Sequence, residues 1–288
     1  MRTRIAILVL AVSAASWVGV GRAVELPRAA DSLKFAVIGD NGTGQPPQYE
    51  VAEQMLVSRA SFPFEFVVML GDNLYGSQAP KDFVNKFERP YAGLLQAGVL
   101  FYAALGNHDV PTSRSYAPFN MGGDRYYTFV KQQVRFFVFD SNLMDPTQLT
   151  WIEATLMQST DPWKIAYFHH PLYSDGGRHG SDVELRVLLE PLLIRYGVTA
   201  VFSGHEHFYE RTTPQNGITY FVEGSSGQLR KGDVNASTMT AAAFDQDRTF
   251  MLVEITGDQL VFQTIARTGR VVDSGVIARR SGTAVGRS

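Results

Sequence analysis

The chain has 288 residues, of which 45% are hydrophobic and 19% are charged, proportions typical of a globular protein with a large buried core. Its 26 Lys and Arg residues against 28 Asp and Glu residues give a net charge of -2, which argues against the strongly basic surface of a nucleic-acid-binding protein. Because the chain contains no Cys, disulfides, thiolate metal ligands and a Cys nucleophile are excluded, and any metal must bind through oxygen and imidazole ligands.

The first 23 residues have the pattern of a secretory signal peptide. Arg2 and Arg4 precede an apolar run over residues 5–20, and small residues follow up to Ala23. This run is shorter than the roughly 20 apolar residues that span a bilayer comfortably, so cleavage is favoured over an uncleaved anchor. We expect a secreted or periplasmic protein without stable membrane association, whose residues 24–288 form a single domain with no N-terminal accessory domain.

Short apolar runs that end abruptly in polar residues predict four buried strands, over residues 33–40, 64–72, 99–109 and 164–170. Stretches with helical periodicity lie between or after them, over residues 47–60, 81–95, 147–158 and 182–196. The last of these is followed by Gly197, which is a stop signal for a helix. Strands that alternate with helices predict βαβ units.

Hairpin patterns appear from residue 126 onward. Residues 126–141 alternate aromatic and polar positions around the polar segment 131–133, and their aromatic residues are predicted to be core. Asn216-Gly217 and Gly257-Asp258 mark two further tight turns. We therefore expect an α/β (α+β) fold, a mixed β-sandwich covered by helices in four layers, α/β/β/α.

The residues that terminate the apolar runs are almost all of metal-ligand type. This matters because ligands collect beyond the carboxyl ends of strands in open α/β sheets. The terminating segments are Gly39-Asp40-Asn41-Gly42, Gly71-Asp72-Asn73-Leu74-Tyr75, Gly106-Asn107-His108-Asp109, Ala166-Tyr167-Phe168-His169 and Gly204-His205-Glu206-His207. All six histidines of the chain lie at or just after these strand ends, namely His108, His169, His170, His179, His205 and His207. Among them His170, between His169 and Pro171, is expected to point away from the site.

These five segments resemble the D-x-G, G-D-x-x-Y, G-N-H-[DE], [VA]-x-x-H and G-H-x-H series of the purple acid phosphatases, in the calcineurin-like metallophosphoesterase superfamily. The resemblance spans residues 39–207 and fills all seven ligand positions. It implies that residues 24–288 are a metallophosphoesterase catalytic domain with two metal ions. The ligands carried over by position are Asp40, Tyr75 and His207 for one ion, Asn107, His169 and His205 for the other, with Asp72 bridging.

Tyr75 separates purple acid phosphatases from other members of the superfamily. A phenolate is a hard oxygen donor, so the resemblance implies Fe(III) at the Tyr75 site and Fe(II), Zn or Mn at the other. It also implies hydrolysis of phosphate monoesters by a metal-bound hydroxide, with a small phosphorylated molecule as substrate. His108 and His179 match the family's catalytic histidines, and together with Asn107 they would contact the substrate.

Two alternatives stay open at this point. The same site serves phosphodiesterases, nucleotidases and nucleotide pyrophosphatases, which differ in their specificity loops rather than in their ligands. An exported metal-binding or interaction protein could also use the fold without turnover. Arg178 and the Gly-rich segment 223–227 are weaker candidates for the site, since an exposed Arg and a plain turn explain them equally well. The oligomeric state is not predicted by any pattern in the sequence.

Overall fold

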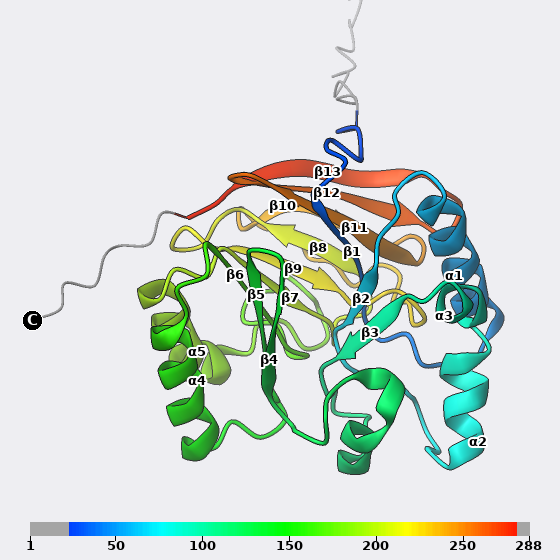
Figure 1. The fold of residues 1–288 in the computed structure, drawn as a ribbon, viewed down its shortest axis with the longest axis horizontal. Coiled ribbons are helices and arrows are strands. Elements are labelled where there is room, and N and C mark those ends of the chain that lie inside the picture. Colours follow the sequence, from blue (N-terminus) through cyan, green and yellow to red (C-terminus); the bar gives the residue numbers. More distant parts are fainter. Residues whose placement is uncertain (1–22, 281–288) are drawn as a thin grey trace, which may run out of the picture.

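The computed structural model describes residues 23–280, so the predicted signal peptide, apart from Ala23, lies outside the described residues. Two mixed sheets stack face to face, and helices cover both outer faces (Figure 1). The predicted four-layer α/β/β/α sandwich is therefore confirmed. Within residues 23–280, no helix combines the length and the apolar character needed to cross a bilayer.

The first sheet has six strands in the order β13-β12-β11-β1-β2-β3. Its parallel part consists of the first three strands of the chain, β1 (Leu33–Ile38), β2 (Phe66–Met69) and β3 (Leu100–Ala103). The rest is an antiparallel meander of β11 (Thr249–Thr256), β12 (Gln259–Ala266) and β13 (Val271–Ala278). β11 pairs antiparallel with β1, so strands that are far apart in the sequence lie side by side in this sheet.

The second sheet has seven strands in the order β10-β8-β9-β7-β6-β5-β4. Its strands are β4 (Tyr127–Lys131), β5 (Val134–Val138), β6 (Trp163–Tyr167), β7 (Ala200–Ser203), β8 (Tyr209–Thr212), β9 (Thr219–Glu223) and β10 (Thr240–Phe244). The predicted hairpins are confirmed: β4 and β5 pair around Gln132, which has a φ of 51°. Asn216 and Gly217, with φ of 51° and 80°, turn β8 into β9, as expected of an Asn-Gly pair.

The main core lies between the two sheets and is rich in aromatic side chains. Phe35 and Phe66 of the first sheet stack with ring centroids 5.3 Å apart, and Phe136 of the second sheet meets Phe35 edge-on at the same distance. All three side chains are completely buried. This packing fixes the two sheets against each other, and with them the loops at their carboxyl ends.

Helices form the outer layers. Helix α1 (Pro46–Arg59) packs on the first sheet, while α4 (Pro146–Gln158) and α5 (Val183–Arg195) pack on the second. The helix predicted over residues 81–95 is instead broken into α2 (Pro80–Phe83), a π-helical turn (Val84–Glu88) and α3 (Ala92–Gln96). The cause is Pro90, which lacks the N–H that a continuous helix needs and crowds the preceding turn. Two 3-10 turns, Pro111–Ser115 and Ala117–Phe119, follow β3.

Candidate metal centre

The carboxyl ends of both sheets meet at one side of the sandwich. In the first sheet, Asp40 follows β1, Asp72 and Tyr75 follow β2, and Asn107 follows β3. In the second sheet, His169 follows β6, and His205 and His207 follow β7. The sandwich thus brings all seven predicted ligands, which are spread over 168 positions of sequence, to one place.

Three of these residues have an unusual backbone conformation. Asp40, Asp72 and His205 have positive φ angles of 52°, 51° and 70°. This left-handed region is uncommon for residues other than glycine, and it costs about 1–3 kcal/mol at each position. Such strain gathers at functional sites, where the surrounding fold holds a side chain in a required direction.

Two glycines make room for the carboxylates. A Cβ at Gly106 would lie 2.2 Å from Oδ1 of Asp72, and a Cβ at Gly204 would lie 2.4 Å from Oδ2 of Asp40. Any larger residue at either position would displace a carboxylate from the site. Glycine is therefore required beside both acids.

The first group of converging side chains consists of Asp40, Tyr75 and His207. The Tyr75 hydroxyl donates to Oδ1 of Asp40 at 2.9 Å and lies 3.2 Å from Nε2 of His207. The same Nε2 lies 3.4 Å from Oδ1 of Asp40. Two oxygens and one imidazole nitrogen therefore face a common point.

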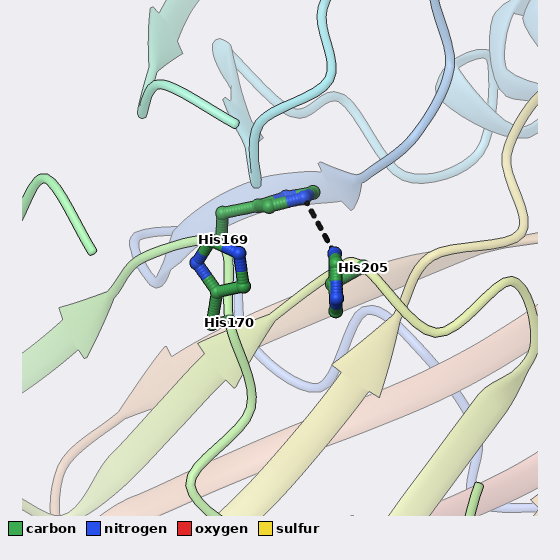
Figure 2. Close-up of side chains that lie close together, drawn as sticks. All are labelled: His169, His170 and His205. Carbon is green, nitrogen blue, oxygen red and sulfur yellow. Dashed lines mark hydrogen bonds between the residues drawn. The ribbon is translucent and has the colours of Figure 1, made fainter. Parts of the chain in front are cut away.

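The second group consists of Asn107, His169 and His205. Oδ1 of Asn107 lies 3.0 Å from Nε2 of His169 and 3.0 Å from Nδ1 of His205. The two nitrogens are 3.2 Å apart, which is the contact drawn as a dashed line in Figure 2. Nδ1 of His169 lies 3.0 Å from the carbonyl oxygen of Leu70, so it carries the proton and leaves the Nε2 lone pair for a metal.

Asp72 lies between the two groups. It forms one cluster of possible ligands with Asp40 and His207, whose donor atoms all lie within 4.8 Å of one another. Oδ1 of Asp72 is also 3.5 Å from Nε2 of His169, in the second group. This is the position that a carboxylate needs if it is to bridge two ions.

The electrostatics of these residues suit a cation. Burial raises the pKa of Asp40 well above its usual range, and the charge of Asp72 raises it further. Burial lowers the pKa of His205 to about 2 and that of His207 to about 4, so both imidazoles are neutral and offer a lone pair. A bound cation offsets the repulsion between the two carboxylates. Because the donors are oxygen and imidazole nitrogen, the set fits hard and borderline metal ions.

An open hollow of about 440 Å³ lies in front of these residues. Its lining includes the two predicted catalytic histidines: the His108 ring lies 4.7 Å from the Tyr75 ring, and the His179 ring lies 4.3 Å from the His205 ring. Arg178 and Arg230 add positive charge to the wall. The hollow is therefore suited to an anion that must reach both ligand groups.

Glu206 is a site residue that no motif of the sequence predicts. It is completely buried, and its Oε1 accepts the backbone N–H groups of His179 at 2.9 Å and Gly180 at 2.6 Å. Its Oε2 accepts from Nη1 of Arg230 at 2.9 Å. The only signal in the sequence is a carboxylate between two proposed ligands, which does not reveal these partners.

The structure corrects the expectation for His170, whose side chain does not point away from the site. Its ring centroid lies 4.9 Å from that of His169 and 4.5 Å from that of His205 (Figure 2). One ring nitrogen of each of these three histidines lies within 4.8 Å of the others. Of the two weaker candidates, the segment 223–227 does pass the site, since a Cβ at Gly224 would lie 2.9 Å from Oδ2 of Asp40.

Comparison with known proteins shows which family the chain is similar to. Residues 33–209 match the family model for calcineurin-like phosphoesterases. The matched range holds all seven proposed ligands, together with His108 and His179. Purple acid phosphatase 4 of Arabidopsis thaliana is 28% identical over 272 residues, which cover 81% of this chain and 80% of that protein.

Two solved structures share the fold. Purple acid phosphatase PPD1 from yellow lupin seeds superposes with a TM-score of 0.71 at 20% identity, over 87% of this chain and 54% of that chain. GAP50, the anchor in the inner membrane complex of Plasmodium, superposes with a TM-score of 0.73 at 17% identity, over 88% of this chain and 90% of that chain.

Proposed function

This chain belongs to the calcineurin-like phosphoesterase family, in which it is purple acid phosphatase-like, and we propose that it hydrolyses phosphate monoesters at a dinuclear metal centre. One observation carries the proposal. Two groups of donor atoms converge on neighbouring points, and Asp72 reaches both of them. The hollow in front of them is lined by histidines and arginines, as an anionic substrate requires.

Each group would hold one ion. Asp40, Tyr75 and His207 supply two oxygens and a nitrogen to the first ion, for which the phenolate oxygen of Tyr75 favours Fe(III). The neutral donors Asn107, His169 and His205 supply the second ion, for which Fe(II), Zn and Mn are all suitable. When bound, two such ions activate water as the nucleophile and polarise the phosphoryl group.

The protein's own side chains would position the substrate and move a proton. His108 and His179 face the hollow from two different loops, so both can donate hydrogen bonds to a phosphoryl group bound at the ligands. An imidazolium in this position can also protonate the leaving alkoxide, which favours activity at acidic pH. Asn107 borders the hollow as well and completes the proposed substrate contacts.

A substrate panel tests the proposal. The chain is loaded with iron alone, or with iron and zinc, and assayed on p-nitrophenyl phosphate, bis(p-nitrophenyl) phosphate, nucleotides and phosphotyrosine. We expect a higher kcat/KM for the monoesters than for the diester. A clear preference for the diester or for a phosphoanhydride would replace the monoester assignment with the phosphodiesterase or pyrophosphatase alternative.

The second candidate is a metal-binding scaffold without turnover. It is favoured by the similarity of the fold to GAP50, which is named as an anchor rather than as an enzyme. Protein that binds two ions per chain and hydrolyses no compound of the panel would support this candidate.

We further propose that the N-terminal segment directs export of the protein. Detection of a shortened mature chain outside the expressing cell would support this proposal.

A further inference from the structure

Ser141 and His170 form a hydrogen-bonded pair beside the proposed metal centre. Oγ of Ser141 lies 2.8 Å from Nδ1 of His170, and the backbone N–H of His170 donates to the same Oγ at 3.1 Å. Ser141 follows β5 and His170 follows β6, so the pair joins two neighbouring strand ends of the second sheet.

This pairing favours a proton on one particular ring nitrogen of His170. Among residues 23–280, Nδ1 of His170 is the one hydrogen-bond acceptor found for the Ser141 hydroxyl. With the hydroxyl as the donor to Nδ1, a neutral imidazole carries its proton on Nε2. His169 shows the opposite arrangement, because its Nδ1–H donates to the Leu70 carbonyl and its Nε2 is unprotonated.

The two neighbouring histidines are thus suited to different tasks. An unprotonated Nε2 can coordinate a metal ion through its lone pair, while a protonated Nε2 can donate a hydrogen bond to an anion. Distance alone groups His170 with His169 and His205 as a possible ligand, but its tautomer argues against metal binding. Figure 2 shows the ring turned toward the other two histidines, with ring centroids 4.9 Å from His169 and 4.5 Å from His205.

Space for such a ligand exists next to His170. The ring lines a second cavity, of about 540 Å³, which shares Asn107 with the hollow in front of the ligand groups. His170 is half-buried, so part of its ring stays accessible from this cavity. A molecule bound at Asn107 would therefore be in contact with both spaces.

We infer that His170 is a substrate-binding residue that donates a hydrogen bond from Nε2 to a phosphoryl oxygen, and that Ser141 holds it in the tautomer required. This inference rests on the proposed phosphoesterase function and adds a donor to Asn107, His108 and His179. It assigns the same contact to inorganic phosphate, which shares the phosphoryl oxygens of the substrate.

Binding of inorganic phosphate to the zinc-loaded protein, measured by calorimetry together with metal content, tests the inference without turnover. We expect His170→Ala to keep both ions and to raise the phosphate Kd about 10-fold, the effect of losing one hydrogen bond to an anion. His170→Gln places an amide donor near the Nε2 position and should restore most of the affinity. Ser141→Ala removes the hydrogen bond to Nδ1, so that His170 can adopt either tautomer, and it should weaken phosphate binding by about 3-fold.

Ser61→Ala is the matched control, since that hydroxyl donates to one backbone carbonyl at the end of α1, and it should leave phosphate binding unchanged. A second measurement reads the tautomer directly: long-range proton–nitrogen spectra of the diamagnetic zinc protein should show His170 Nδ1 unprotonated in the wild type and partly protonated in Ser141→Ala.

Loss of one ion per chain from His170→Ala would make His170 a metal ligand and overturn the inference. An unchanged phosphate Kd with both ions retained would overturn it equally. The proposed function can fail independently of this inference. A wild-type protein that binds phosphate in a His170-dependent manner but hydrolyses no ester would contradict the phosphoesterase function and still support the contact between His170 and phosphate. A wild-type protein that binds two ions but no phosphate overturns both.

Discussion

Oε1 of Glu206 accepts the backbone N–H of His179 at 2.9 Å, so a residue between two proposed metal ligands also holds the loop that carries a proposed catalytic histidine. Oε2 of the same carboxylate binds Arg230, which in turn binds Asp233 at 3.0 Å. The space is tight, because a Cβ at Gly176 would lie 2.5 Å from the Glu206 carboxylate. The backbone of the loop that carries His179 is therefore held by a buried side chain.

Replacing Glu206 with Gln should lower kcat about 10-fold while both ions stay bound. An amide has one acceptor oxygen instead of two, so it cannot serve both the loop and Arg230, and even a small displacement of a catalytic group is costly. Steady-state kinetics with metal analysis measures this. Glu190→Gln is the matched control, since Glu190 accepts from Tyr173 at 2.8 Å and from Tyr220 at 3.1 Å without lining the hollow. An unchanged kcat in Glu206→Gln would show that the loop is held by other contacts.

Replacing Asp72 with Ala should remove at least one ion per chain and lower kcat/KM by a factor of about 1000 or more. The bridging position is lost, and the two ligand groups no longer share a donor. Metal content after dialysis and kcat/KM on p-nitrophenyl phosphate measure the two effects. Asp258→Ala removes an Asp whose side chain is 77% exposed, and it should change neither quantity. Full metal content in Asp72→Ala would argue against a bridge.

Replacing Tyr75 with Phe should abolish the visible colour of the iron-loaded protein. The Tyr75 hydroxyl lies between Asp40 and His207, and the phenolate–Fe(III) bond proposed there is the source of the charge-transfer band. Visible spectra of equally iron-loaded wild type and variant make the comparison. An unchanged band in the variant, or a colourless but active wild type, would contradict the iron assignment and leave the phosphoesterase assignment intact.

Replacing His179 with Ala should lower kcat about 100-fold for an alkyl phosphate and distinctly less for p-nitrophenyl phosphate. An alkoxide needs a proton as it leaves, whereas p-nitrophenolate is stable without one. The ratio of the two losses, measured with metal content, is the informative quantity. Equal losses for both substrates would assign His179 to phosphate binding and not to proton transfer.

Replacing Asp175 with Asn should destabilise the protein near neutral pH and have little effect in acid. Burial raises the pKa of Asp175, but hydrogen bonds from Thr240 and Ser237 outweigh it and hold the pKa below its usual value. A carboxylate whose pKa is lowered by folding stabilises the protein at pH values above 3.8, its pKa in the unfolded chain. This stabilisation is lost as the pH falls through the lower pKa of the folded state. Urea unfolding should show a difference of about 1 kcal/mol near neutral pH. A difference that persists in acid would contradict this origin.

Most of the proposed ligand set could be predicted from the sequence because it depends on where buried strands end. Asp40, Asp72 and Asn107 directly follow apolar runs, and the sheet itself brings such positions together. The helix predicted over residues 81–95 was wrong in one respect, since periodicity continues through Pro90 although a helix does not. Local patterns therefore located the strand ends well and the helix boundary less well.

The side-chain directions of His170 and Glu206 could not be predicted. Alternation of faces holds only within a strand, and β6 ends at Tyr167, so His169 and His170 can both turn toward the same point. The partners of Glu206 lie in the loop at residues 179–180 and at Arg230, more than 20 positions away on either side. Such contacts depend on the completed sandwich and leave no local pattern.

The division of the proposed ligands between the two sheets has a consequence for the order of events during folding. Residues up to Asn107 supply four donors from the first sheet, and residues from His169 onward supply three from the second. Neither half of the chain holds a complete set for both ions, and a preformed metal site rarely exists in an unfolded chain. Both ions can therefore bind only after the two sheets have docked. Once bound, the ions would link the two sheets of the assembled sandwich.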